Sequence, residues 1–198
     1  MLKHQLRPAI LLTVLLCLIT GLVYPGIVTA LAQLLFPRQA NGSLISAANG
    51  QLIGSALIGQ TFARAEYFHA RPSAAGTGYD DTLSGGTNKG PTDRKLADTL
   101  IAQAVDSAVK LDGAVKGRLP ADLVTSSGSG LDPHISPASA LLQVGRVARA
   151  RGLNAAAVRA LVERHVEGRQ LEFLGEPRVN VLELNLALDS LWGSRPRP

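Results

Sequence analysis

Residues 8–36 of this chain read PAILLTVLLCLITGLVYPGIVTALAQLLF, and this stretch decides how the protein folds. It contains no formally charged side chain, and Leu, Ile, Val or Phe occupies 16 of its 29 positions. An α-helix needs about 20 apolar residues to cross a hydrocarbon core about 30 Å thick. We therefore predict one membrane-spanning helix over residues 8–36. The residues expected to anchor it in the membrane are Leu11, Leu15, Leu18, Leu22, Tyr24 and Pro25.

A cleaved secretory signal is the alternative interpretation of this stretch, because Ala30 and Ala32 form a small-x-small cleavage pattern. The apolar core of a signal peptide spans about 7 to 15 residues, which is shorter than this run. Apolar residues also continue past the supposed cut, through Leu34 and Phe36. The pattern favours an uncleaved anchor. Pro25 removes a backbone donor, so we expect a kink there and a neighbouring helix of a protein partner beside it.

The orientation of the span follows from the cations that flank it. Lys3 and Arg7 lie before it, whereas Arg38 is the only Lys or Arg in the first 25 residues after it. The positive-inside rule places such a cation-rich end in the cytoplasm. We therefore expect residues 1–7 to form a cytoplasmic tail and the chain from residue 37 onward to lie outside.

The part that follows the span has about 160 residues, enough for one domain that buries about two-thirds of its unfolded surface. Cys17 is the only cysteine and lies in the apolar run, so the outer domain relies on a core without a disulfide. That domain carries 18 Lys and Arg against 15 Asp and Glu, and the whole chain has eight aromatic residues. Neither a phosphate-tracking groove nor a base-stacking platform is indicated, which argues against nucleic acid as a partner.

Composition divides this outer part further. Residues 37–50 are polar and indicate a linker, residues 51–58 indicate a strand, and the Gly-rich residues 71–91 indicate a long loop. We predict a single N-terminal transmembrane helix followed by one α+β extracytoplasmic domain, mostly helices with a few short strands. This soluble domain is expected over residues 51–193, with a flexible tail over residues 194–198.

Four helices are predicted from apolar periodicity combined with capping residues. They are expected to run from Thr92 or Asp93 to Gly113, from Ser136 and Pro137 through Arg151, from Asn154 to Gly168, and from Asn180 to Gly193. In the last helix the expected buried stripe consists of Val181, Leu184, Leu188, Leu191 and Trp192.

The stretch with the most suggestive chemistry, residues 126–137, reads SSGSGLDPHISP. A phosphate-binding P-loop requires a Lys after its second glycine, and none follows here. A dinucleotide-binding turn requires a third glycine where Pro133 stands, and a nucleophile elbow requires glycine where Ser127 precedes Ser129. No catalytic residue is assigned.

Asp132 and His134 are both types of metal ligand, but a third ligand at a suitable spacing is missing, so we assign no metal site. A structural turn is the main alternative, in which Asp132 accepts hydrogen bonds from backbone donors and Pro133 directs the chain toward the Ser136 cap. Contact with a partner or ligand is the other. The candidate contact loop consists of Ser126, Ser127, Gly128, Ser129, Gly130, Asp132 and His134.

Residues 120–137, PADLVTSSGSGLDPHISP, resemble the signature of the C subunit of the Kdp potassium-transporting P-type ATPase. Further matching segments are Tyr24-Pro25, GSALIGQ at residues 54–60, Tyr67-Phe68, RPSA at residues 71–74 and VNVLELN at residues 179–185. Their order and spacing also match, so the resemblance covers essentially the whole chain except residues 195–198.

The resemblance implies an accessory, non-catalytic subunit in the inner (cytoplasmic) membrane of a bacterium. The implied partners are a channel-like potassium-translocating subunit, a P-type ATPase subunit and a small single-span subunit, all within the lipid bilayer. Potassium is carried by the complex. No cofactor is expected in this chain itself. ATP binding enters only through a role proposed for the family, in which the C subunit acts as a catalytic chaperone that raises the ATP affinity of the ATPase subunit.

Two roles remain open within this family. The chain is either a structural clamp that assembles and stabilises the complex, or a regulator that binds a nucleotide or ion through the Gly/Ser loop. Outside the family, the alternative is a stand-alone membrane-anchored extracytoplasmic binding or interaction protein. The sequence favours the clamp, because it offers partner-like surfaces and no complete ligand site.

Overall fold

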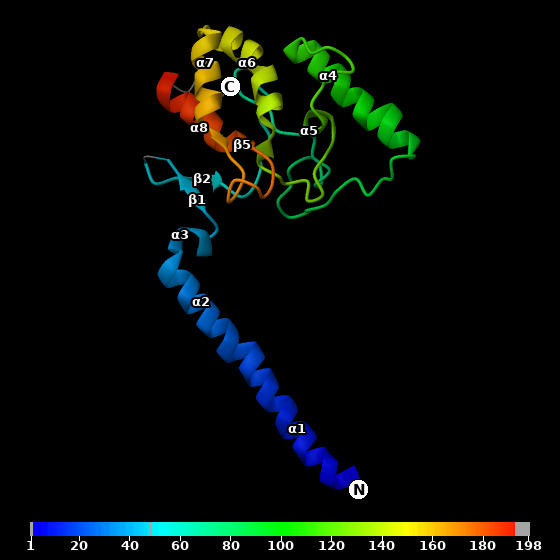
Figure 1. Cartoon of the computed structure of the whole chain (residues 1–198), viewed down its shortest axis with the longest axis vertical. Coiled ribbons are helices and arrows are strands. Elements are labelled where there is room, and N and C mark those ends of the chain that lie inside the picture. The colour runs from blue at the N-terminus through cyan, green and yellow to red at the C-terminus, as the bar shows by residue number, and fades with distance from the viewer. Residues whose placement is uncertain (1, 48, 193–198) are drawn as a thin grey trace. The chain divides into compact units, whose positions relative to one another are not determined.

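The computed structural model describes residues 2–47 and 49–192, so the predicted tail at residues 194–198 lies outside the described residues. The chain forms two compact units, Met1–Ser55 and Ala56–Pro198 (Figure 1).

The first unit begins with a long helical run (Figure 1). It consists of helix α1 (Leu2–Leu18), the π-helical turn η1 (Ile19–Val23) and helix α2 (Tyr24–Leu35). Within it, the helix Gln5–Leu35 contains an 18-residue window with a mean hydropathy of 2.3 and no buried residue, so by length and composition it can cross a membrane. This confirms the long apolar helix. The helix starts earlier than residue 8, and Phe36 already has the extended φ of −137° that ends it.

The helix changes its hydrogen-bonding pattern just before Pro25. The N–H of Tyr24 bonds to the carbonyl of Ile19, five residues back, and the chain returns to an α-helix through Pro25. Proline has no N–H, and its ring crowds the carbonyl four residues before it. A wider π turn is one known way for a helix to accommodate such a residue. A π turn therefore lies directly before Pro25, where the sequence predicted a kink.

The residues after this helix are more structured than the sequence indicated. The expected linker at residues 37–50 contains helix α3 (Pro37–Ala40) and strand β1 (Leu44–Ser46). Strand β1 pairs in antiparallel fashion with β2 (Leu52–Ser55), so a hairpin forms where the linker was expected. The predicted strand over residues 51–58 is also shorter than expected, because the chain turns after Ser55.

The second unit is rich in helices and, within residues 56–192, has one small sheet. Its helices are η2 (Leu96–Ile101, a π-helix), α4 (Ala102–Asp112), α5 (Ala121–Val124), α6 (Pro137–Arg151), α7 (Ala155–Arg164) and α8 (Val181–Trp192). Its strands are β3 (His134–Ile135), β4 (Val166–Glu167) and β5 (Arg178–Asn180), antiparallel in the order β3-β5-β4.

Local capping chemistry sets several of these helix ends as predicted. Ser136 Oγ accepts the N–H of Ser139 at the start of α6, and Gly152 ends that helix with a φ of +68°. Equivalent caps occur at the start of the helical turn, residues 94–95, that leads into η2, and at the starts of α7 and α8. They are made by Asp93, Asn154 and Asn180, whose side-chain oxygens accept backbone N–H groups two or three residues later.

Three details of the helix predictions are wrong. The third helix ends at Arg164 and not at Gly168, because Val166 leaves it to pair with Val179 in the sheet. Leu191 and Trp192 were expected in a buried stripe, but they are 57% and 37% exposed. Along η2 and α4 the apolar face is mostly accessible, and Ala108 is the one described residue of those elements that is buried.

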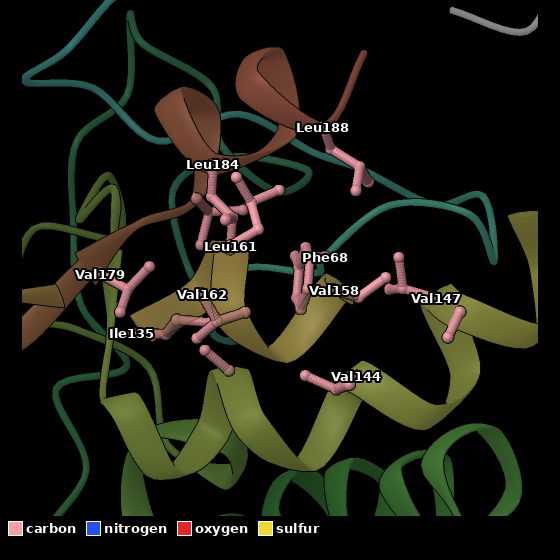
Figure 2. Close-up of a cluster of buried hydrophobic side chains, with 13 residues drawn as sticks. Phe68, Ile135, Val144, Val147, Val158, Leu161, Val162, Val179, Leu184 and Leu188 are labelled. Atoms are coloured by element: carbon pink, nitrogen blue, oxygen red, sulfur yellow. The ribbon is translucent and has the colours of Figure 1, made fainter. Parts of the chain in front are cut away.

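The core lies between α6, α7, α8 and the sheet (Figure 2). Val147, Val158 and Leu184 contribute to it from the three helices, each fully buried. Phe68, which belongs to neither a helix nor a strand, also lies inside this cluster with no exposed area. Burial of such side chains supplies most of the driving force for folding.

Candidate functional site

The candidate contact loop joins α5 to β3 and is fixed to two distant segments of the chain. The N–H of Gly85 donates to the carbonyl of Ser129 over 2.8 Å, and Ser84 Oγ donates to the same carbonyl over 3.0 Å. On the other side, the N–H of Gly59 donates to the carbonyl of Leu131 over 2.8 Å. Segments about 45 and 70 residues earlier in the chain therefore hold the middle of the loop.

The serine hydroxyls of the loop bond to its own backbone. Ser127 Oγ accepts the N–H of Gly130 at 2.8 Å, and Ser129 Oγ accepts the N–H of Leu131 at 3.1 Å. The two hydroxyls are 3.4 Å apart. Short polar side chains that bond to nearby backbone groups are typical of turns. The hydroxyls therefore define the shape of the loop.

A glycine of the loop, Gly130, allows close approach between these segments. A Cβ at Gly130 would lie 2.6 Å from the carbonyl oxygen of Gly85 and 2.7 Å from the amide nitrogen of Ala75. Gly130 also has a φ of +69°, which other residues adopt only with strain. Its carbonyl accepts a hydrogen bond from Ser73 Oγ at 2.6 Å. Gly130 is thus buried at a tight crossing of backbones.

Asp132 makes the turn that leads into β3, as the structural interpretation predicted. Its carboxylate accepts the backbone N–H of His134 at 3.0 Å, and the ring nitrogen Nδ1 of His134 lies 3.3 Å away. Arg71 donates from Nη1 to the other carboxylate oxygen over 3.1 Å. Burial by itself raises the pKa of Asp132, but the hydrogen bonds from His134 and Arg71 outweigh it and lower this pKa to about 2.

Arg71 continues the network away from the loop. Its Nε donates to the carbonyl of Thr125 over 3.2 Å, and its own carbonyl accepts the hydroxyl of Tyr79 at 2.8 Å. Burial, together with the charge of Asp132, raises the pKa of Tyr79 to about 12. The phenol therefore stays protonated and acts as a hydrogen-bond donor. The sequence analysis identified the RPSA segment but gave Arg71 and Tyr79 no role, because the hydrogen-bond partners of the Arg71 side chain are 54 and 61 residues away in sequence.

An open hollow of about 640 Å³ lies over this loop. Its lining is mixed, with apolar side chains from the turn after β2 and polar groups from the loop. The lining residues are Leu57, Ile58, Arg71, Ser126, Ser127, Gly128, Ser129, Leu131, Asp132 and Pro133. Five of the seven predicted loop residues belong to it. The other two do not line it, because Gly130 is buried and His134 pairs with Asn180 in the sheet.

The site offers a surface of defined shape, with few polar groups left to bond to a ligand. Within residues 2–47 and 49–192, no group of three or more His, Cys, Asp or Glu side chains is placed to hold a metal ion. The carboxylate of Asp132 is occupied by Arg71 and His134, and the hydroxyls of Ser127 and Ser129 accept backbone N–H groups. Most polar groups of the loop are thereby committed to holding its conformation.

A second polar network, which sequence reasoning missed, holds residues 65–71. We call this segment the strap. Asn185 on α8 bonds to both the N–H and the carbonyl of Phe68, at 2.9 Å each. Gln143 on α6 does the same for His69, at 2.7 and 3.1 Å. The strap ends with Arg71, which lines the hollow, so these bonds position one side of the candidate site.

Two arginines of α6 complete this network. Arg146 donates to the carbonyls of Ala65 and Tyr67 over 2.8 Å each and pairs with Asp112 at 2.7 Å. Arg151 donates to the carbonyl of Glu66 over 2.8 Å. A signal was available in the sequence for Arg151, which follows Val144, Val147 and Ala148 by seven, four and three residues and so lies on the apolar face of the predicted helix. A buried charge needs a partner, and such a position indicates one.

The predicted anchor residues are all on the first unit's helix. Leu11, Leu15, Leu18 and Leu22 project from it with exposed side chains, as do Tyr24 and Pro25. Exposed leucines in such number fit a helix whose surroundings are apolar.

Comparison with known proteins gives a consistent result. The sequence model of the family described as "K+-transporting ATPase, c chain" (KdpC) matches residues 6–190. A potassium-transporting ATPase KdpC subunit from Gemmatimonas aurantiaca is 65% identical over 197 residues, which cover 99% of this chain and 97% of that protein. KdpC subunits from Koribacter versatilis and Geobacter sulfurreducens are 54% and 51% identical, over 99% and 94% of this chain and 98% of each relative.

Proposed function

Because the chain belongs to the KdpC family of K+-transporting ATPase c chains and is an accessory subunit of a Kdp complex, we propose that it is a non-catalytic assembly clamp. In this role the apolar helix packs in the membrane against a neighbouring subunit, and the second unit presents a fixed surface to the rest of the complex. The candidate contact loop is part of that surface.

The commitment of the loop's polar groups to its own conformation carries this proposal. A ligand site usually offers convergent polar groups that are free to bond to the ligand. Here Ser127, Ser129 and Asp132 are already bonded within the protein, while Leu57 and Ile58 contribute apolar side chains to the lining of the hollow. Apolar groups beside satisfied polar groups are typical of a protein contact. The nucleotide-binding regulator, and with it the chaperone role, has less support from this arrangement.

The partners and location proposed for the chain follow from the family. We assign the chain to the bacterial inner membrane as a single-pass protein with its N-terminus inside and its second unit outside. Lys3 and Arg7 support this orientation. Its partners are the channel-like subunit, the ATPase subunit and the small single-span subunit, and the complex carries the potassium. ATP hydrolysis then belongs to a partner.

Substitutions in the loop test the clamp directly. We expect Ser129→Ala, Asp132→Asn and His134→Ala to lower the yield or stability of the purified complex in graded fashion, by about 1 to 3 kcal/mol at most where a buried partner is left unsatisfied. The potassium-stimulated ATPase activity of each intact complex should stay within about tenfold of the unsubstituted one. A loss of a thousandfold or more with full assembly would show that the loop has a chemical role, because loss of a catalytic group commonly costs several orders of magnitude.

Reporter fusions test the orientation. Alkaline phosphatase fused after Pro198 should be active, and a reporter that works only in the cytoplasm should be inactive at the same position. The opposite pair of results would place the second unit inside.

A further inference from the structure

The loop between β4 and β5 presents three large apolar side chains to solvent. They are Leu171, Phe173 and Leu174, with exposed fractions of 76%, 68% and 47%, and we call them the apolar tip. They lie within four consecutive positions of the sequence, residues 171–174. Clustered exposed apolar groups mark interaction sites far more often than single ones do.

The tip has a defined conformation. Gln170 and Leu174 exchange both backbone hydrogen bonds at 2.9 Å, which closes a tight loop between them. Within that loop, Leu171 and Glu172 have φ angles of +51° and +69°. Residues other than glycine adopt this region at a cost, and such strain concentrates at binding sites. The apolar side chains are thus held in place before any partner arrives, which reduces the entropy lost on binding.

Charge distribution around the tip distinguishes the possible partners. Arg169 pairs with Glu176 at 2.8 Å and Arg178 with Glu167 at 2.9 Å, so the nearby cations are neutralised at the base of the loop. Glu172, between the two most exposed apolar residues, has no ion-pair partner among the residues that the structure describes. The end of the loop is therefore apolar with one unneutralised carboxylate.

A lipid surface fits this pattern poorly. Segments that enter the membrane interface combine apolar groups with Trp or Tyr and with free Lys or Arg. The tip has neither, and insertion of its apolar residues would carry the carboxylate of Glu172 toward the hydrocarbon at high cost. A protein recess can bury the apolar side chains and place a cation opposite the carboxylate.

We propose that the apolar tip docks into an apolar recess of another polypeptide of the same complex, with a Lys or Arg at its rim that pairs with Glu172. This proposal rests on the proposed function, since it requires a partner subunit. It adds a specific contact to that function, with Phe173 as the central anchor, the kind of aromatic residue that dominates protein interfaces.

A photo-crosslinker at the tip identifies the neighbour. Phe173→p-benzoylphenylalanine is introduced into the full chain, the complex is purified and irradiated, and the crosslinked species are analysed by mass spectrometry. We expect a crosslink to another polypeptide of the complex, at a segment with apolar residues and a nearby Lys or Arg. A crosslink to phospholipid, or none in a fully assembled complex, would overturn the proposal.

Substitutions measure how much the contact contributes. Phe173→Ala and Leu171→Ala should each lower the affinity for the complex by about tenfold, measured as dissociation of the subunit on dilution in detergent. Val115→Ala, which trims a similarly exposed aliphatic side chain after α4, should leave dissociation unchanged. Glu172→Lys should weaken binding more than Glu172→Gln, because it places like charges together. Equal effects of these two changes would refute the cationic rim.

Failure of this proposal can be separated from failure of the proposed function. If the unsubstituted chain does not co-purify with other subunits, the assembly role itself is wrong. If it co-purifies and the variants of the tip dissociate no faster than Val115→Ala, the assembly role stands and the tip is not a contact.

Discussion

Two regions of the molecule find hydrogen-bond partners for their backbone N–H and carbonyl groups in opposite ways. They are the apolar span, Gln5–Leu35, and the strap, residues 65–71. In the span, each turn of the helix bonds to the turn before it, so the structure follows from local sequence. The strap has no helix or strand, and side chains from α6 and α8 bond to its N–H and carbonyl groups from more than 70 residues away. Substitutions should therefore act locally in the span and over long distances at the strap.

The largest loss of stability is expected from breaking the buried ion pair that holds the strap. In Arg146→Met, Asp112 keeps a carboxylate that is 5% exposed, and the carbonyls of Ala65 and Tyr67 lose their donor. Removing one partner of a buried pair costs about 3 to 5 kcal/mol. We expect that loss in the thermal unfolding of the full chain in detergent.

The matched control is Arg159→Met, which makes the same change in a pair whose side chains are 59% and 58% exposed. Exposed pairs contribute about 0 to 1 kcal/mol, so the melting temperature should hardly change. Similar losses in both variants would mean that the strap does not depend on this buried pair.

The span should be sensitive to a single charge at its middle. An arginine at the centre of a membrane helix costs about 2.5 to 3.5 kcal/mol on the translocon scale. We expect Leu18→Arg to reduce membrane insertion and co-purification with other subunits. Leu34→Arg, close to the end of the same helix, can extend its charge toward water and should have a smaller effect. Equal behaviour of the two variants would contradict a span centred near residue 18.

A smaller effect is expected where the loop crosses the segment that follows the strap. Gly130→Ala adds a Cβ that would lie 2.6 Å from the carbonyl oxygen of Gly85, at a φ of +69°. Strain and overpacking of this kind cost about 1 to 3 kcal/mol. Gly128→Ala is the control in the same loop, because a Cβ there meets nothing within 4 Å. If both changes lower the stability equally, the close crossing is not what fixes the loop.

The smallest effect is a dependence on pH that comes from Asp132. Its pKa falls from 3.8 to about 2 on folding, because hydrogen bonds from His134 and Arg71 outweigh burial. A lowered pKa contributes stability that is complete above about pH 4 and is lost as the pH falls toward 2. Unfolding of the chain between pH 4 and 2 should therefore depend less steeply on pH in Asp132→Asn. Parallel curves for the two proteins would contradict the assignment.

Sequence analysis predicted best those elements whose ends are set by residues adjacent to them in sequence. Ser136 and Gly152 bound α6 because a hydroxyl and a left-handed glycine act on adjacent backbone groups. The third helix was extended too far because its end depends on the pairing of Val166 with Val179, which no local pattern shows. The exposed apolar face of α4 likewise looked like a core face, because periodicity does not reveal whether another element covers it.

The candidate site was predicted in the same uneven way. The turn at Asp132 was found because its hydrogen bond to the backbone of His134 spans two residues. The roles of Arg71 and Tyr79 were not found, since Arg71 reaches Asp132 only after the strap has been fixed by Gln143 and Asn185. The Gly- and Ser-rich composition was enough to identify the loop as a candidate contact segment. Its hydrogen-bond network could be seen only in the three-dimensional structure, because it joins segments that are distant in sequence.

By itself the sequence determined the long apolar N-terminal helix and the caps of α6 and α8, because these depend on residues that are close together in the chain. Its matching segments, spread along the chain, also indicated the family. Tertiary structure decided the course of the strap, the tight crossing at Gly130 and the rigid display of the apolar tip. Each of these joins groups that are distant in sequence or depends on which apolar side chains are left uncovered, and only packing determines both.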